Sequence, residues 1–304
     1  MMRAGPSLPN LTEDTFTPDR TRLVAEAACR EVGLDATGAV LMRHQTNAVF
    51  RLVTEPVVVK VVRPGIRHTR DMVKLVQWLV GQGVPSVALL EKIRQPLQLA
   101  GCAVTLWHYL PQERAISAAD IAGPLRALHE LPPPPMKVPE LDALGAIHHS
   151  IQVSRLLSTE ERESLLRHWK RLVDLVPQLR YSAGSQLIHG DPQHRNTLWD
   201  NEYGRPVLCD WESAALGHVE WDLVTIDVHC RRFGFAEQDY VDFCQRYGRD
   251  IRDWDGYPVL RDLRELRMIT TNARKSAVGS PEAVEVHRRI AALGGESNDR
   301  WVIL

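Results

Sequence analysis

The stretch 187–212 constrains the fold of this chain more than any other part of it. It starts at the end of an apolar run that is typical of a buried strand, and it continues into a loop that contains Asp191 and Asn196. Two further apolar runs flank a turn at residues 200–204, and the second run ends just before Asp210. This order predicts a β-hairpin that returns Asp210 to the neighbourhood of Asn196.

The polar residues of this stretch are of the types that phosphoryl transfer requires. Asp191 and Asn196 are 5 positions apart, the spacing of the protein kinase catalytic loop, in which the Asp orients the attacking hydroxyl and the Asn binds magnesium. Asp210 stands at the place of a second metal-binding acid. A positioned acceptor and neutralised phosphate charge supply most of such catalysis. Singly, each residue could be a turn residue, a cap or a surface charge, so it is the joint pattern that favours catalysis.

At these residues the chain resembles the aminoglycoside phosphotransferase and choline kinase-like family, relatives of the protein kinases. The loop of that family reads His-Gly-Asp followed by an Asn, which here are His189 to Asp191 and Asn196. The resemblance continues upstream at residues 57–60 and downstream at residues 220–223, so it covers most of the chain. It implies an α+β, bilobal protein kinase-like fold, with a small β-sheet N-lobe and a mostly helical C-lobe.

The resemblance also implies roles for individual residues. Asp191 would be the catalytic base, and Asn196 and Asp210 would be the magnesium ligands. His189 and Asp222 would brace the catalytic loop without taking part in the chemistry.

The resemblance also implies that the chain divides into three parts. Residues 1–104 are expected to form the nucleotide-binding lobe with an extra N-terminal helix, 105–111 the hinge, and 112–304 the helical lobe for catalysis and acceptor binding.

Caps, breakers and apolar periodicity predict the local elements. Helices are expected at residues 18–32, 69–81, 220–233, 236–248, 258–275 and 281–293, with another opened by a capping box at 158–161. A further helix should open at Ser117, and Gly123-Pro124 should kink or delay it. Strands are expected at residues 48–54, 57–62 and 103–106.

Lys60 is embedded in an apolar strand, and an unpaired buried ammonium is costly. It should therefore face a cleft and hold the α- and β-phosphates, although the solvent side of a two-faced strand is the simpler alternative. Asp71 is the only acid between Lys60 and Glu91. It could pair with the lysine, or serve only as a favourable charge at a helix N-terminus. The loop with Thr46 and Asn47 has no glycine, but its N–H groups and the Thr46 hydroxyl could still meet phosphate.

The expected hinge contains Trp107, Tyr109 and Leu110. Adenine recognition there would use main-chain groups, so side-chain identity carries little information.

The acceptor site is the least defined part of the sequence. Glu212 and Asp227 are candidate acceptor-binding acids. A polycationic aminoglycoside would call for a strongly acidic pocket, whereas residues 231–300 carry both signs almost equally. A neutral or singly charged acceptor is at least as compatible with the sequence.

Composition sets outer limits. With 304 residues and 44% hydrophobic content, the chain can bury the cores of two lobes. A net charge of −1 argues against a nucleic-acid partner. Five cysteines without a C-x-x-C pair indicate a reducing compartment. No secretory signal or membrane-spanning run is present, so we expect a cytoplasmic protein, either monomeric or homodimeric.

These observations predict an ATP- or GTP-dependent, magnesium-dependent O-phosphotransferase that acts on a small hydroxylated molecule, such as an amino sugar or an antibiotic that it would inactivate. One alternative is a catalytically silent, kinase-like nucleotide-binding protein that serves as an interaction module. A protein kinase is disfavoured, because no D-F-G or A-P-E segment follows the catalytic loop.

Overall fold

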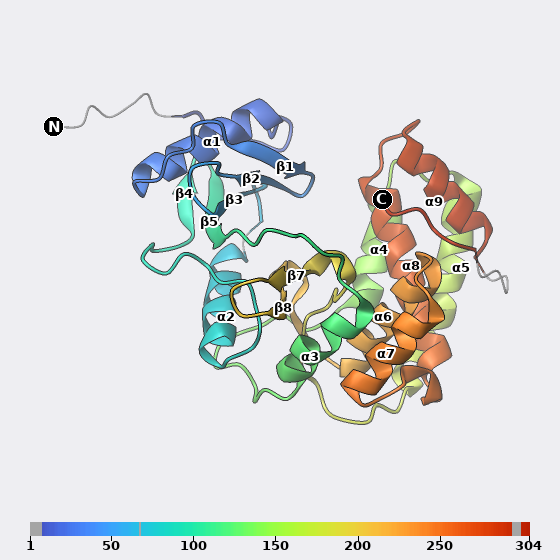
Figure 1. Ribbon diagram of the computed structural model, residues 1–304. Helices are drawn as coiled ribbons and strands as arrows, with labels where there is room; N and C mark the ends of the chain where they lie inside the picture. Colours follow the sequence, from blue (N-terminus) through green and yellow to red (C-terminus); the bar gives the residue numbers. More distant parts are fainter. Residues whose placement is uncertain (1–7, 67, 294–298) are drawn as a thin grey trace. The chain divides into compact units, whose positions relative to one another are not determined.

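The computed structural model describes residues 8–66, 68–293 and 299–304 (Figure 1). The chain divides into two compact units. The first comprises Met1–Ala115, Pro134–Lys137 and Leu198–Glu212, and the second comprises Ile116–Pro133, Val138–Thr197 and Ser213–Leu304.

A five-stranded antiparallel sheet forms the centre of the first unit, in the order β1-β2-β3-β5-β4. Its strands are β1 (Val40–His44), β2 (Asn47–Arg51), β3 (Val57–Val62), β4 (Leu97–Leu99) and β5 (Cys102–His108). Helix α1 (Pro18–Glu31) packs on the sheet, and the apolar side chains of both join in one buried cluster (Figure 1). Helix α2 (Thr69–Gly81) follows β3.

Alternation along β3 sends successive side chains to opposite faces of the sheet. Val57, Val59 and Val61 belong to the cluster shared with α1. Lys60 therefore points to the other face, where it is flanked across the sheet by Thr105 of β5.

The predicted hairpin after the catalytic loop is confirmed as a two-stranded sheet of β7 (Thr197–Asp200) and β8 (Arg205–Leu208). Leu208 N donates to the carbonyl oxygen of Pro85 at 2.9 Å, and Val87 N donates to the carbonyl oxygen of Leu208 at 2.9 Å. These bonds attach the hairpin to the segment after α2. Residues 198–212 are consequently part of the first unit, although they lie within the stretch 112–304 that the resemblance assigns to the second lobe.

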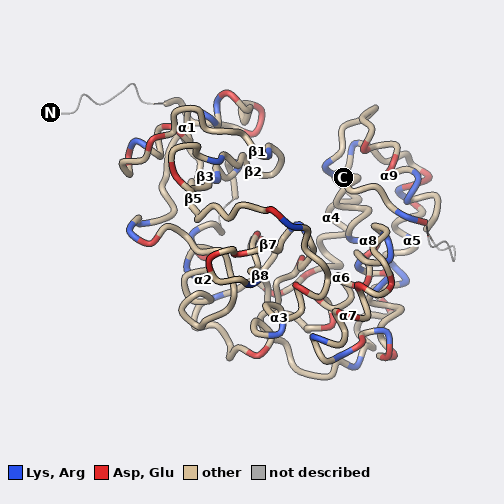
Figure 2. Tube along the Cα trace, viewed as in Figure 1, with Lys and Arg blue, Asp and Glu red and all other residues tan. Residues whose placement is uncertain are grey.

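The second unit is mostly helical. Its helices are α3 (Ala118–His129), α4 (Ala143–Val153), α5 (Thr159–Leu175), α6 (Val219–Arg232), α7 (Glu237–Tyr247), α8 (Tyr257–Lys275) and α9 (Pro281–Ala291). Helix α8 contacts α4, α5, α6 and α9, and α3 packs on α7. Ser117 and Ser158 form the capping boxes that open α3 and α5. Acidic and basic residues are interspersed along these helices (Figure 2).

A short antiparallel pair, β6 (Gln186–Ile188) and β9 (Ala215–Gly217), lies within this helical unit. The loop that contains Asp191 leaves the end of β6, and a 3-10 turn at His194–Asn196 closes it. Ladder hydrogen bonds to β9 and packing on α3 and α6 hold β6 in place.

Two local expectations need correction. Helix α3 runs through Pro124 without interruption, because its capping box fixes the start at Ala118 and the proline ring is buried in the apolar face. Strand β5 continues to His108, because Val57 and Val58 of β3 pair with His108 and Trp107. Strands β1 and β4 and helix α4 were not predicted, since their sequences lack clear periodicity.

None of the helices in the described part of the chain has the length and apolar character of a membrane-spanning segment.

Candidate functional site

The loop after β6 is held by one buried carboxylate. Asp222 accepts hydrogen bonds from the backbone N of His189 at 2.8 Å and of Gly190 at 2.9 Å. Gly190 has φ +81°, and a Cβ atom there would lie 2.1 Å from the carbonyl oxygen of Ser213, so only glycine fits. The expected bracing contact of Asp222 is thus formed, and it positions the next residue, Asp191.

Asp191 is surrounded by hydrogen-bond donors. Arg264 donates to Oδ1, while Gln193 Nε2 and Asn196 Nδ2 donate to Oδ2 at 2.8 and 3.1 Å. Burial alone would raise the pKa of the Asp191 carboxyl, but the charge and the hydrogen bond of Arg264 hold that pKa below its ordinary value. Asp191 is therefore an oriented carboxylate at neutral pH, able to accept a hydrogen bond from a hydroxyl.

Asn196 is buried beside it, with 5% of its surface exposed. Its Nδ2 also donates to the main-chain oxygen of Asp191 at 2.9 Å. Both of these bonds use the amide nitrogen, so the amide oxygen Oδ1 is left without a hydrogen-bond donor among the described residues. An amide oxygen in this state suits a hard divalent cation such as Mg²⁺.

A second polar cluster lies in the first unit around Lys60. Its ammonium group is 2.9 Å from Asp210 Oδ1 and also contacts Glu212 Oε1. Arg43 lies 3.7 Å from the other oxygen of Asp210. Asp210 has φ +66°, a conformation that non-glycine residues rarely adopt and that is common at functional sites. Two acids thus share one buried ammonium at the end of the hairpin.

The charges of this cluster shift one another's pKa values. Burial would lower the pKa of Lys60, but Glu212 and Asp210 raise it above its usual value. Burial would raise the pKa of Asp210, but Lys60 holds it far below its usual range. Burial and the neighbouring Asp210 raise the pKa of Glu212 to about 7 against the attraction of Lys60. One acid is therefore firmly ionised, and the other changes charge near neutral pH.

Thr46 and Asn47 are the expected phosphate-contacting residues. Thr46 lies in the tight turn between β1 and β2, and Asn47 is the first residue of β2. Thr46 is exposed, whereas Asn47 is buried and its Nδ2 donates to Glu212 Oε1 at 3.4 Å. The other amide atom, Asn47 Oδ1, is buried without a partner among the described residues. The turn therefore brings Asn47, but not the Thr46 side chain, to the Lys60 cluster.

Asp71 is not a partner of Lys60, because Asp210 and Glu212 occupy the ammonium group. Its exposed side chain lies in the first turn of α2, where it favours the helix start. The position of the lysine's acidic partner is taken instead by Glu212, which the sequence had suggested as an acceptor-binding residue.

The expected adenine-binding segment is partly closed by hydrogen bonds within the first unit. The Trp107 side chain is 8% exposed, and its Nε1 donates to Thr105 Oγ1 at 2.9 Å. Tyr109 N donates to the carbonyl oxygen of Pro56 at 2.8 Å. Leu110 is the first residue of this segment whose N–H has no acceptor among the described residues.

Asp227, the other suggested acceptor-binding acid, is fully buried. Arg252 Nε and the Tyr257 hydroxyl each donate to one of its oxygens at 2.7 Å. Both oxygens are thus used in joining α6 to the 3-10 turn Ile251–Asp253 and to the start of α8, and a bound acceptor would have to displace one of these partners to reach them.

Sequence reasoning missed Arg264 altogether. The predicted helix at 258–275 is confirmed, but helical periodicity gives no sign that one of its arginines pairs with Asp191, 73 positions away. The only sequence signal was the position of Arg264 between Leu263 and Leu266 on the apolar face of that helix.

Solved structures of known proteins share this fold. A choline/ethanolamine kinase family protein from Mesorhizobium loti is 18% identical, with a TM-score of 0.65 over 90% of this chain and 94% of that one. An aminoglycoside phosphotransferase from Streptomyces rimosus is 21% identical, with a TM-score of 0.62 over 81% and 98%. An amicoumacin kinase in complex with AMP-PNP, Ca²⁺ and its ligand is 12% identical, with a TM-score of 0.70 over 93% and 97%. At these identities the likeness establishes the kinase-like fold.

Two sequence comparisons bear on the family. A non-specific serine/threonine protein kinase of Drosophila melanogaster is 27% identical over 124 residues, which span 41% of this chain but only 15% of that kinase. The sequence pattern of the phosphotransferase enzyme family matches residues 40–263. This match runs from β1 into α8 and includes both polar clusters except Arg264, and by it the chain belongs to the phosphotransferase enzyme family.

Proposed function

We propose that the protein transfers the γ-phosphoryl group of ATP or GTP to a hydroxyl of a small molecule in a magnesium-dependent reaction. The observation that carries this proposal is the state of Asp191, which is ionised, oriented by three donors and followed by an amide oxygen at Asn196 that lacks a donor among the described residues. Membership of the phosphotransferase enzyme family supports the same reaction class.

Asp191 would act on the acceptor. Its carboxylate would accept a hydrogen bond from the hydroxyl and orient the oxygen toward the γ-phosphorus. As the new P–O bond forms, the bond to the β-phosphate oxygen breaks, and the hydroxyl proton passes to Asp191 or to solvent. The low pKa of Asp191 favours an orienting role over strong general-base catalysis.

The nucleotide would be bound by residues of the first unit, namely Lys60, Asn47 and Leu110. Lys60 would hold the α- and β-phosphates, and Leu110 N–H would meet the adenine edge. Asn196 and Asp210 would provide oxygen ligands for Mg²⁺, and when bound the ion would neutralise phosphate charge.

The acceptor is proposed to be neutral or anionic. On α8 the acids are already paired, Glu265 with Arg231 and Arg232, and Asp262 with Arg171. Arg267 lies one turn after Arg264 and has no ion pair with any residue in the described part of the chain. A helix that offers an unpaired arginine and no unpaired acid near Asp191 disfavours a polycationic acceptor.

The test is a coupled assay of ADP release with Mg-ATP over a panel of hydroxylated acceptors, grouped by charge. Turnover with a neutral or anionic acceptor is expected. Asp191→Asn should lower that turnover by ~10²–10⁴-fold while Mg-ATP binding is retained, and the exposed Asp174→Asn serves as the matched control. Binding of Mg-ATP without transfer to any acceptor would favour the silent interaction protein, and turnover restricted to polycations would reject the acceptor class.

A further inference from the structure

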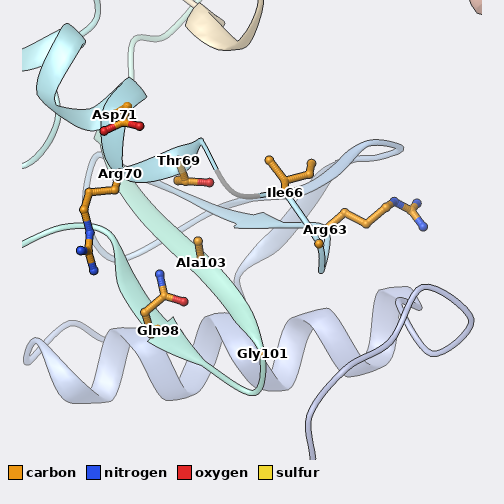
Figure 3. Close-up of a pocket in the computed structure, with 9 residues that line it drawn as sticks. Arg63, Ile66, Thr69, Arg70, Asp71, Gln98, Gly101 and Ala103 are labelled. Atoms are coloured by element: carbon orange, nitrogen blue, oxygen red, sulfur yellow. The ribbon is translucent and has the colours of Figure 1, made fainter. Parts of the chain in front are cut away.

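A cavity of about 420 Å³ opens in the first unit, and none of the residues that line it belongs to the Lys60 cluster. It is bordered by the start of α2, by the segment after β3 and by β4, β5 and the turn between them (Figure 3). Its volume lies within the range of small-molecule sites, roughly 300–1,000 Å³. The side chains that line it are mostly polar.

Thr69 is the most informative of these side chains. It is 6% exposed, it lines the cavity, and its hydroxyl has no hydrogen-bond partner within the described residues. Figure 3 shows this hydroxyl directed to the space between Ile66 and Ala103. The hydroxyl is accessible from the cavity, so it can form a hydrogen bond with a polar ligand there.

The first turn of α2 adds backbone donors. His68, the residue before the helix, provides no side-chain cap. The N–H groups of Thr69, Arg70 and Asp71 therefore have no acceptor among the residues that can be described. Free N–H groups and the helix dipole together favour an anion at this end of a helix.

Two more side chains can reach the same space. Arg70 extends from α2 toward Gln98 of β4 (Figure 3), and neither has an ion pair or side-chain hydrogen bond with a described residue. Arg63 also lines the cavity, but its guanidinium donates to the carbonyl oxygen of Gln45 and lies 4.7 Å from the Phe16 ring. Arg70 is thus the available cation, and Gln98 an available amide donor.

The carboxylate of Asp71 also borders the cavity, and its negative charge repels an anion. In Figure 3 it lies on the side of Thr69 that faces away from Gln98 and Ala103. Its charge should weaken the affinity for an anion without blocking the space near Arg70.

We propose that this cavity binds the phosphate group of a small molecule through Arg70, the Thr69 hydroxyl, the Gln98 amide and the N–H groups at the start of α2. Charge-assisted bonds from the guanidinium and backbone donors at a helix N-terminus are the usual means of phosphate recognition. The ligand would connect α2 to β4 and stabilise the unit that contains Lys60. The phosphate could be inorganic phosphate or part of a phosphorylated metabolite.

Isothermal titration calorimetry of the full chain with inorganic phosphate, and separately with glycerol 3-phosphate at the same ionic strength, tests the proposal. We expect saturable binding of at least one of the two. Arg70→Gln should weaken it about tenfold or more and Thr69→Val severalfold, because each removes a donor to a charged group. Tighter binding of glycerol 3-phosphate would indicate a phosphorylated metabolite, and equal or tighter binding of inorganic phosphate would indicate the free ion.

Three control variants test whether phosphate binds in this cavity and not elsewhere on the chain. Arg94→Gln, an exposed arginine of the same unit that does not line the cavity, should change the affinity by less than about twofold. Asp71→Asn should strengthen binding, which a merely destabilised variant would not do. Lys60→Met should leave phosphate binding unchanged. Absence of saturable binding, or binding that Lys60→Met abolishes and Arg70→Gln does not weaken, would overturn the proposal whether or not the protein proves to be a phosphotransferase.

Discussion

Arg264 of α8 donates to the carboxylate of Asp191, so the proposed catalytic residue is paired with a guanidinium that is itself 7% exposed at its side chain. Arg264 also forms a cation–π contact, since its guanidinium lies 5.5 Å from the centre of the Trp221 ring. The Trp221 indole N–H in turn donates to the carbonyl oxygen of Gly190 at 2.9 Å. Helix α8, helix α6 and the loop after β6 therefore position one carboxylate together.

Replacing Arg264 should shift the pH dependence of turnover. Because Arg264 lowers the pKa of Asp191, Arg264→Gln should raise that pKa, and the acidic limb of the kcat/KM profile should move to higher pH. Arg264→Lys should restore part of the shift. Arg274→Gln, at an exposed site on the same helix, is the control. An acidic limb that stays in place in Arg264→Gln would show that Asp191 does not depend on this arginine.

Asp222→Ala should destabilise the second unit. The side chain is fully buried and accepts two backbone hydrogen bonds and a contact from His129 Nε2 at 3.0 Å. Its removal leaves buried donors unpaired, at a cost of roughly 3–5 kcal/mol. Urea unfolding of the variant and of the exposed-site control Asp255→Ala measures this difference. A loss below about 1 kcal/mol would contradict a bracing role.

Glu212 should make stability decrease as pH rises toward neutrality. Its pKa is raised from 4.5 to about 7 in the folded protein, so the folded state binds more protons than the unfolded state between these values. Stability from this group is full below about pH 4.5 and is lost as pH rises through 7. Glu212→Gln should reduce the pH dependence of the melting temperature between pH 5 and pH 8, whereas Glu163→Gln, at an exposed site, should not. An unchanged slope in Glu212→Gln would place the pKa near its ordinary value.

His229 and His194 should make the stability of the protein fall as the pH decreases below about 6.5. Burial lowers the pKa of His229 to about 3 and that of His194 to about 4, so both are neutral in the folded protein. The unfolded state takes up these protons below about pH 6.5, and stability should fall by up to about 1.4 kcal/mol per pH unit for each histidine. His229→Gln should reduce that slope in urea unfolding between pH 6 and pH 4. The exposed-site variant His149→Gln should keep it, and equal slopes in both variants would exclude His229 as a source.

Local chemistry accounts for the predictions from the sequence that were confirmed. Helix α2 begins and ends at the predicted residues 69 and 81, and α5 opens at the predicted capping box, because caps and periodicity act within a few residues. The hairpin of β7 and β8 follows from its turn in the same way. The expected delay of α3 at Pro124 was wrong, since the helix starts at Ala118 and packing on α7 outweighs the local cost of a proline.

The sequence by itself indicated most of the helices and strands, the family and the candidate residues for phosphoryl transfer, because short-range spacing encodes all three. Only the tertiary structure decided which charges meet. Lys60 is paired with Glu212, 152 positions away, and not with nearby Asp71, while Asp191 is paired with Arg264. Such pairs depend on which side chains burial brings into contact, since a buried charge must find its partner wherever the fold places one.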